Sequence, residues 1–369
     1  MNNEFSIEKK LREIANIFHA NGTLVSYEVI TTGNINSTYW LKFSQGNGVT
    51  KTYIMQRINT YVFKKPQEIM SNISLVTNHI RSKSIPGQQT LMFYVTDEGK
   101  NYYDDGEGNF WRMSNHIDSI TFDSCDELSV MEAVGAAFGD FQNMLSDFDA
   151  PKLFETIPDF HNTKKRIENL MLNIEKDECG RVAEVKEEID FVKEHAELAS
   201  KLTVMLENGE VPLRVTHNDT KINNVLFDKK THYPIAIIDL DTVMPGLAMH
   251  DFGDAVRFAC NTAAEDEKDL SKVSLDLTRF QAFAQGFIGK TAKSLTEAEL
   301  NTMVLGAITI TIELGVRFLD DYITGDKYFK TLYDGHNLVR TKCQFALAKD
   351  MLKKREAMEY LIGDIVSQC

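Results

Sequence analysis

A short segment in the middle of the chain carries the residues best suited to chemistry. His217, Asp219 and Asn224 spell H-x-D-x-x-x-x-N directly before a strand-like apolar run, and a second carboxylate, Asp239, ends the next run twenty positions after Asp219. Phosphoryl transfer needs a carboxylate that orients the attacking hydroxyl and accepts its proton. It also needs oxygen ligands that hold Mg²⁺ on the nucleotide phosphates. This set of residues can supply both.

The spacing predicts how these residues come together. The turn-rich DKKTHY separates the runs NVLF and PIAIID, as in a small hairpin. Such a hairpin brings Asn224, at the start of one strand, close to Asp239, at the end of its partner, with Asp219 on the loop above them. Such a string arises by chance in roughly a few per cent of chains of this length. The alternative is therefore that His217 and Asp219 form a structural turn and that Asn224 is a strand cap.

The flanking segments differ in periodicity and predict an α+β fold with two lobes. Runs rich in β-branched and aromatic residues lie at 27–33, 37–44, 51–59, 91–96 and 109–117, with helical patterns at 7–18 and from Pro66 onward. They predict a five-stranded antiparallel sheet with one inserted helix. From about Cys125 the helical period dominates, at 126–147, 163–175, 181–207, 275–288 and 296–321. The predicted division is 1–116 for the N-terminal lobe and 117–369 for the helical C-terminal lobe, with a cleft between them.

The composition narrows the class of protein. The 369 residues carry 40 Lys plus Arg against 54 Asp plus Glu, a net charge of −14, which makes nucleic acid and anionic membrane poor partners. The 43% hydrophobic and 25% charged content is that of a soluble globular protein. Five scattered cysteines without a C-x-x-C motif, no secretion signal and no membrane-length apolar run predict a cytoplasmic location.

Two segments, VTHNDTKINNVLFD and AIIDLDTVMPG, resemble the aminoglycoside phosphotransferase and choline kinase group of protein-kinase-like small-molecule kinases. Within that group they look like the bacterial N-acetylhexosamine 1-kinases, as do TTGNINSTYW, YIMQRIN and ELGVRFLDDYITGDKYF. The likeness extends from about residue 26 to 329. It implies a protein-kinase-like fold whose N-terminal lobe binds ATP and whose C-terminal lobe holds the catalytic loop and a sugar site.

The resemblance also implies roles for individual residues. Asp219 is then the catalytic base and contacts the substrate, and Asn224 and Asp239 are the magnesium ligands. Asp241, Arg317 and Tyr328 match positions that contact the sugar. From the residues alone, Arg317 in an apolar stretch must reach either a carboxylate or the cleft, and Tyr328 is either a core aromatic or a sugar contact.

The segments expected to face the nucleotide depart from the protein-kinase pattern. TTGNINSTYW has one glycine, Gly33, whose turn could bring backbone amides, with Asn34 and Asn36, to the phosphates. An ordinary hairpin turn fits the same spacing. Strand alternation puts Gln56 where the phosphate-binding lysine usually lies, so the Gln56 amide would donate while Arg57 or another cation neutralises charge.

A literal D-F-G at 251–253 is predicted to be a decoy. Asp251 lies thirty-two residues past Asp219, at the start of a helical stretch, and we expect a buried carboxylate that holds the backbone of the catalytic loop. Asp254 and Arg257 fit a solvated or paired surface of the same helix. Asp321, next to the Arg317 stretch, is expected on a solvated face.

The predicted activity is an ATP- and Mg²⁺-dependent kinase that phosphorylates the anomeric hydroxyl of GlcNAc or GalNAc, acting as a monomer or weak homodimer. One alternative is a kinase of another hydroxylated metabolite, such as choline or an aminoglycoside. The other is a non-catalytic pseudokinase that binds nucleotide or sugar, suggested only by Gln56 in place of lysine.

Overall fold

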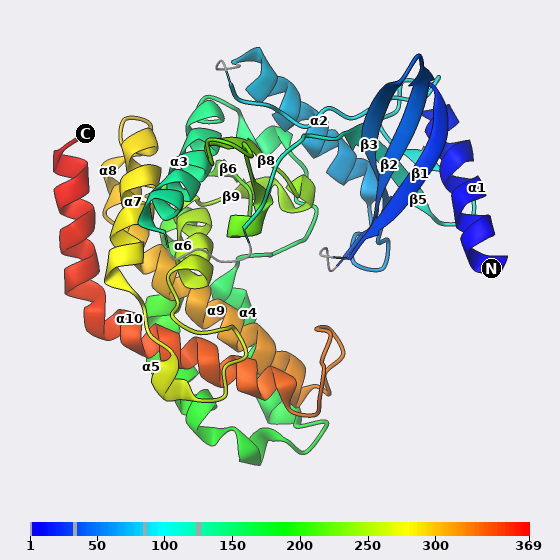
Figure 1. Ribbon diagram of the computed structural model, residues 1–369. Helices are drawn as coiled ribbons and strands as arrows, with labels where there is room; N and C mark the ends of the chain where they lie inside the picture. The colour runs from blue at the N-terminus through cyan, green and yellow to red at the C-terminus, as the bar shows by residue number, and fades with distance from the viewer. Residues whose placement is uncertain (1, 32–34, 84–86, 123–126) are drawn as a thin grey trace.

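The computed structural model describes residues 2–31, 35–83, 87–122 and 127–369, and it confirms the two-lobe α+β fold (Figure 1). The N-terminal lobe is an antiparallel sheet with strand order β1-β2-β3-β5-β4. Its elements are α1 (Asn2–Ile17), β1 (Thr23–Ile30), β2 (Ser37–Gly46), β3 (Val49–Ile58), α2 (Pro66–Ser82), β4 (Tyr103–Asp104) and β5 (Phe110–Asn115). Gly33 and Asn34 lie outside the described residues.

The predicted strand at 91–96 is wrong. This segment makes only an isolated bridge between Phe93 and Ser114, and the fifth strand of the sheet is the short β4. The free edge of β5 is shared, because Phe93 lies beside its end at Ser114 while Tyr103 pairs with Trp111 near its start. Two short segments therefore cover an edge that one longer strand was expected to occupy.

The two helices of this lobe pack against different partners. Leu11, Ile14 and Phe18, on and just after α1, join a core with the sheet residues Leu41 and Phe43. Helix α2 instead packs in a core that includes three residues of the C-terminal lobe, namely Val215, Leu240 and Val243. The buried Asn72 amide of α2 also donates to the Val243 carbonyl at 3.0 Å. Helix α2 thus ties the sheet to the part of the chain that carries the candidate site.

The C-terminal lobe is built around α9, which contacts α10, α6, α4 and α5. Its helices are α3 (Leu128–Met144), α4 (Thr163–Lys176), α5 (Lys186–Glu207), α6 (Ala248–Ala259), α7 (Leu277–Thr291), α8 (Glu297–Leu300), α9 (Met303–Ile323) and α10 (His336–Ser367). Helices α3 and α7 touch through glycines: a Cβ at Gly135 would lie 2.1 Å from the Phe283 carbonyl oxygen. Only glycine allows so close an approach of the two backbones.

Two features of this lobe differ from the sequence prediction. The single helix expected over 296–321 is two helices, because α8, begun by a capping box between Thr296 and Glu299, ends at Leu300 before α9 starts. The long terminal helix α10 was not predicted at all. Figure 1 shows α10 changing direction along its course, so its apolar residues do not keep to one face and the helical period is weak.

Candidate active site

Two small antiparallel pairs build the site in the C-terminal lobe. Strand β6 (Arg214–Thr216) pairs with β9 (Met244–Gly246), and β7 (Val225–Phe227) pairs with β8 (Pro234–Ile237), which confirms the predicted hairpin. We call residues 217–224 the catalytic loop and residues 239–241 the β8 turn. The Ile238 amide donates to the Asn224 carbonyl at 2.9 Å, so the end of the loop lies directly beside the start of the turn.

Two other residues of the catalytic loop hold the carboxylate of Asp219 in place. The Asn224 side-chain amide donates to the Asp219 carbonyl at 2.8 Å and to its carboxylate at 3.0 Å. Lys221 Nζ lies 2.7 Å from the other carboxylate oxygen, and a quarter of the Asp219 side chain is exposed. Although burial opposes it, the charges of Asp219 and Asp254 raise the pKa of Lys221. Asp219 is therefore oriented and open to a ligand, and Lys221 is a cation that the sequence reasoning missed.

Asp239 follows Ile238, whose amide bonds to Asn224, and the charge of Asp219 acts on its carboxylate. Its backbone is left-handed, with φ 60° and ψ 57°, a conformation that aspartate tolerates better than most residues. The residue is exposed, yet the protein around it desolvates the carboxylate. This desolvation, together with the charges of Asp241 and Asp219, raises the pKa of Asp239 to about 6.

The donor atoms here suit magnesium. Among the described residues, none donates a hydrogen bond to the Asp239 carboxylate or to the Asn224 amide oxygen. Within the same part of the chain no three His, Cys, Asp or Glu side chains gather as a complete metal cluster. A cation held by one carboxylate and one amide oxygen would complete its shell with phosphate and water, which is how Mg²⁺ usually binds.

Helix α6 fixes the backbone of the catalytic loop. The Asp251 carboxylate, only 1% exposed, accepts hydrogen bonds from the His217 and Asn218 amides, each at 2.8 Å, and from Gln142 at 2.6 Å. Burial raises the pKa of Asp251. Asn218 has a left-handed backbone, with φ +62°, and the Asp251 side chain holds it in this conformation. The prediction for the D-F-G aspartate is confirmed.

A second carboxylate of α6 continues this support. Asp254 accepts from the Thr220 amide at 3.0 Å and pairs with Arg257 at 2.8 Å. The two side chains were expected on a solvated or paired surface, but the residues are only 8% and 5% exposed. Despite the opposing effect of burial, Arg257 and Lys221 lower the pKa of Asp254. The pairing was predicted correctly and the exposure was not, because this helix is buried on several sides.

The β8 turn contacts the N-terminal lobe through Asp241, whose carboxylate is engaged by Arg112 of β5 and Asn36. Asp241 is 2% exposed and Arg112 is 3% exposed. Gln56, the residue in place of the expected lysine, accepts a hydrogen bond from Arg112 Nε at 2.9 Å. The sugar contact assigned to Asp241 stays a prediction. Arg112 was missed because only the pairing of β3 with β5 brings it beside Gln56, and no local pattern in the sequence marks this pairing.

Arg317 of α9 and Tyr328, in the segment that follows this helix, lie against each other. The Arg317 guanidinium lies over the rings of Phe160, Tyr328 and Phe329, at 5.2 to 5.9 Å from their centroids. No described residue forms an ion pair with it, so of the two alternatives Arg317 does not reach a carboxylate. Tyr328 is 65% exposed and is therefore not a core aromatic.

Asp321 organises the segment that carries Tyr328. Its carboxylate accepts hydrogen bonds from the backbone amides of Lys327, Tyr328 and Phe329 at 2.8 to 2.9 Å. The residue is 5% exposed, so the expectation that it belongs to a solvated face is wrong. A carboxylate can be buried when backbone amides satisfy its oxygens.

A buried polar cluster lies deeper in the lobe. Glu313 of α9 accepts from His161 at 2.8 Å and from Thr163 at 2.5 Å, and the His161 and His250 rings lie 5.2 Å apart. Burial, with the charge of His161, lowers the pKa of His250 to about 3. Despite burial, the charge and hydrogen bond of His161 and the Thr163 hydroxyl lower the pKa of Glu313 to about 2. Sequence reasoning gave this cluster no role, because its members are far apart in the chain.

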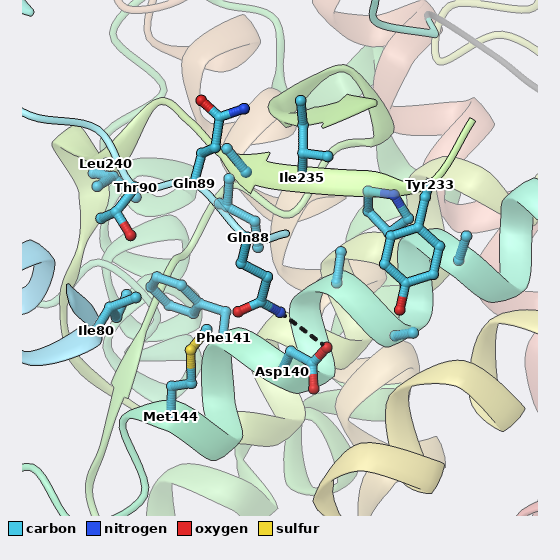
Figure 2. Close-up of a pocket in the computed structure, with 16 residues that line it drawn as sticks. Ile80, Gln88, Gln89, Thr90, Asp140, Phe141, Met144, Tyr233, Ile235 and Leu240 are labelled. Carbon is cyan, nitrogen blue, oxygen red and sulfur yellow. Dashed lines mark hydrogen bonds between the residues drawn. The ribbon is translucent and has the colours of Figure 1, made fainter. Parts of the chain in front are cut away.

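A pocket behind the hairpin is separate from these groups (Figure 2). Its lining includes Ile80, Gln88, Asp140, Phe141 and Ile235, and Gln88 donates to Asp140 at 3.3 Å. None of the three predicted catalytic and metal-binding residues lines it. Four successive residues of β8, 234–237, line it, so it lies against the hairpin and not among the proposed reacting groups.

The two lobes and the geometry of the catalytic loop define a protein-kinase-like phosphotransferase fold. Residues 26–273 match the model of the phosphotransferase enzyme family, and the chain belongs to that family. No helix among the described residues is long and apolar enough to cross a membrane.

Solved structures share the fold at low sequence identity. A microcompartment-associated aminopropanol kinase has a TM-score of 0.63 at 13% identity, over 95% of this chain and 98% of that one. A spectinomycin phosphotransferase in complex with ADP and spectinomycin has 0.56 at 13%, over 94% and 98%. The choline kinase from Cryptosporidium parvum has 0.55 at 12%, over 92% and 93%. At these identities the likeness establishes the fold.

Proposed function

We propose that the protein is a kinase that transfers a phosphoryl group from Mg²⁺-bound ATP to the anomeric hydroxyl of GlcNAc or GalNAc. One observation carries the proposal. The Asp219 carboxylate is accessible and oriented by Asn224 and Lys221, and its charge acts on the Asp239 carboxylate, to which no described residue donates a hydrogen bond. A proton acceptor next to oxygen ligands for a cation is what phosphoryl transfer requires.

Each residue of this group would have a separate task. Asp219 orients the attacking hydroxyl and accepts its proton, and Lys221 keeps the Asp219 carboxylate in place. Asn224 and Asp239 would hold Mg²⁺, which when bound neutralises charge on the phosphate oxygens. Most of the rate acceleration then comes from positioning and electrostatics.

The nucleotide would lie against the N-terminal lobe. The family assignment and the ADP held by the spectinomycin phosphotransferase of the same fold support ATP as the donor. We assign phosphate contacts to Gly33, Asn34 and Asn36, of which Asn36 is seen reaching the β8 turn through Asp241. Gln56 would act indirectly, because its carbonyl oxygen is taken by Arg112 and its amide donates to Thr38.

The acceptor would lie against Arg317 and Tyr328, whereas the carboxylate of Asp241, the third expected sugar contact, is engaged by Arg112 and Asn36. Arg166 lies near Arg317 and has a buried Nε without a hydrogen-bond partner. Burial and the charge of Arg317 lower the pKa of Arg166. No described carboxylate forms an ion pair with either guanidinium group, so the pair opposes a cationic acceptor and can donate hydrogen bonds to hydroxyl groups.

The second candidate is a kinase of a cationic alcohol. The structural neighbours named as aminopropanol and choline kinases favour it, and so does the net charge of −14. The two arginines at the acceptor wall oppose it, and for this reason we place it second.

A sugar panel decides between the two. The purified protein is incubated with Mg-ATP and GlcNAc, GalNAc, glucose, choline or spectinomycin, and phosphorylated product is measured. We expect an acid-labile sugar phosphate from an N-acetylhexosamine, since an anomeric phosphate hydrolyses in acid where a 6-phosphate does not. Phosphorylation of choline without any sugar product would support the second candidate. Binding of Mg-ATP without product from any acceptor would indicate a pseudokinase.

A further inference from the structure

Arg112 is a buried cation in the middle of the N-terminal sheet. It lies on β5 opposite Gln56 of β3, and its side chain is 4% exposed. All three guanidinium nitrogens are used: Nε donates to Gln56 at 2.9 Å, Nη2 donates to Asp241 at 3.1 Å, and Nη1 donates to the other Asp241 oxygen. The arginine therefore makes a two-point contact with a carboxylate of the other lobe.

The contact converges on the β8 turn from several N-terminal segments. Asn36, just before β2, donates to Asp241 at 2.6 Å and accepts from the Asn59 amide at 2.9 Å. Gln56 donates in turn to Thr38 of β2 at 3.1 Å. Asp241 is thus contacted directly by β5 and by the residue just before β2, while β3 holds Arg112 through Gln56.

Stability alone does not account for such a pair. Desolvating two ions can cost as much as their attraction returns, so a buried ion pair is weak evidence of a stabilising role. Its geometric effect is firmer, because a fork of two parallel hydrogen bonds fixes both distance and orientation. Here the fixed object is the β8 turn, whose Asp239 lies two residues from the clamped carboxylate.

We propose that Arg112 is a positioning residue: through Asp241 it sets the place of Asp239, and so of the magnesium ion and the phosphates, relative to the N-terminal sheet. This rests on the proposed function. Gln56 holds the Arg112 guanidinium in place. The sheet is thus linked to the metal site by the arginine of β5, whereas the phosphate-binding lysine was expected at position 56. Asp241 then acts toward the nucleotide side of the site and not toward the sugar.

A double-mutant cycle tests the clamp. The variants Arg112→Met, Asp241→Asn and the double variant are compared with the wild type for melting temperature, Mg-ATP dissociation constant, half-saturating Mg²⁺, kcat and acceptor KM. Each single variant leaves one buried charge unpaired and should lower the melting temperature. The double variant should regain much of the lost melting temperature. Its Mg-ATP binding should stay weaker than in the wild type by about tenfold or more, but no weaker than in the worse single variant.

Two further variants separate positioning from general packing. Arg112→Lys keeps the charge without the fork and should fall between the wild type and Arg112→Met in Mg-ATP binding. Arg214→Met breaks a comparable pair with Glu299, at 2.7 and 2.9 Å, that lies wholly within the C-terminal lobe. It should lower the melting temperature and leave the Mg-ATP dissociation constant within about twofold.

The outcomes are distinguishable. A double variant with wild-type Mg-ATP binding would overturn the clamp, as would a change confined to the acceptor KM, which would make Asp241 a sugar contact. Because binding of Mg-ATP is measured without any acceptor, a wrong choice of sugar does not affect the test. A wild-type protein that does not bind Mg-ATP would overturn the proposed function and this inference with it.

Discussion

The catalytic loop and the β8 turn lie side by side but are held by different means. Buried carboxylates of α6 hold the loop by accepting its backbone amides, as Asp251 does for His217 and Asn218. The turn is held across the lobes by a side-chain ion pair between Arg112 and Asp241. The loop is therefore held within the C-terminal lobe, whereas the turn, whose flanking residue Thr242 bonds to the loop, is also clamped to the N-terminal lobe.

This difference separates two requirements of phosphoryl transfer. The proton acceptor must stay in one place whatever the nucleotide does, and a loop fixed by its own lobe provides that. The cation must lie beside the phosphates, which the N-terminal lobe is proposed to bind, and a turn that is also clamped to that lobe keeps the cation next to them. Substitutions should accordingly fall into different groups by what they change.

The largest effect is expected from removing the proton acceptor while leaving its support intact. Asp219→Asn should lower kcat by about 10³-fold or more, because general-base catalysis is lost. The melting temperature and Mg-ATP binding should stay close to those of the wild type, since Asp251 and Asp254 still hold the loop. A coupled assay for ADP release, with a thermal melt as control, measures both. Turnover near the wild-type value would remove Asp219 from the mechanism.

The next effect comes from the support itself. Asp251→Asn leaves one buried oxygen in place of two, so one of the two loop amides loses its acceptor at a cost of about 1–3 kcal/mol. We expect kcat to fall by about 10- to 100-fold together with the melting temperature. Asp251→Glu, which keeps the charge with a longer arm, serves as the comparison. A lower melting temperature with unchanged kcat in the protein that stays folded would show that the catalytic loop keeps its active geometry without this side chain.

The comparison also explains what the sequence could and could not predict. The hairpin and the role of Asp251 were predictable, because turn residues and short-range spacing determine them. Arg112 and Asp241 are 129 residues apart, and nothing local marks them as partners. Asp321 was misplaced for a related reason: a charged residue was expected in water, but three backbone amides of a later loop satisfy it inside the protein.

The β8 turn should respond to pH within the working range. The pKa of Asp239 is raised to about 6, so its carboxylate takes up a proton as the pH falls through that value and ceases to be a good ligand for Mg²⁺. Half-saturating Mg²⁺ should therefore rise several-fold between pH 7.5 and 5.5, in inverse proportion to the fraction of Asp239 that stays unprotonated. Asp239→Asn should remove this dependence and weaken Mg²⁺ binding at all pH values. A flat Mg²⁺ requirement in the wild type would contradict the assignment.

The smallest effect is expected at the acceptor wall, which is held as the catalytic loop is, by backbone amides bound to Asp321. Tyr328→Leu removes an exposed ring that lies 5.9 Å from the Arg317 guanidinium and leaves the segment in place. The acceptor KM should rise by about three- to tenfold, since a partly exposed aromatic contact contributes little more than 1 kcal/mol. Half-saturating Mg²⁺ should not change, because this wall is independent of the clamp on the β8 turn. Tyr360→Leu, at a tyrosine of α10 that is 75% exposed, is the matched control. An equal change in both variants, or a change in Mg²⁺ dependence, would mean that Tyr328 does not act on the acceptor.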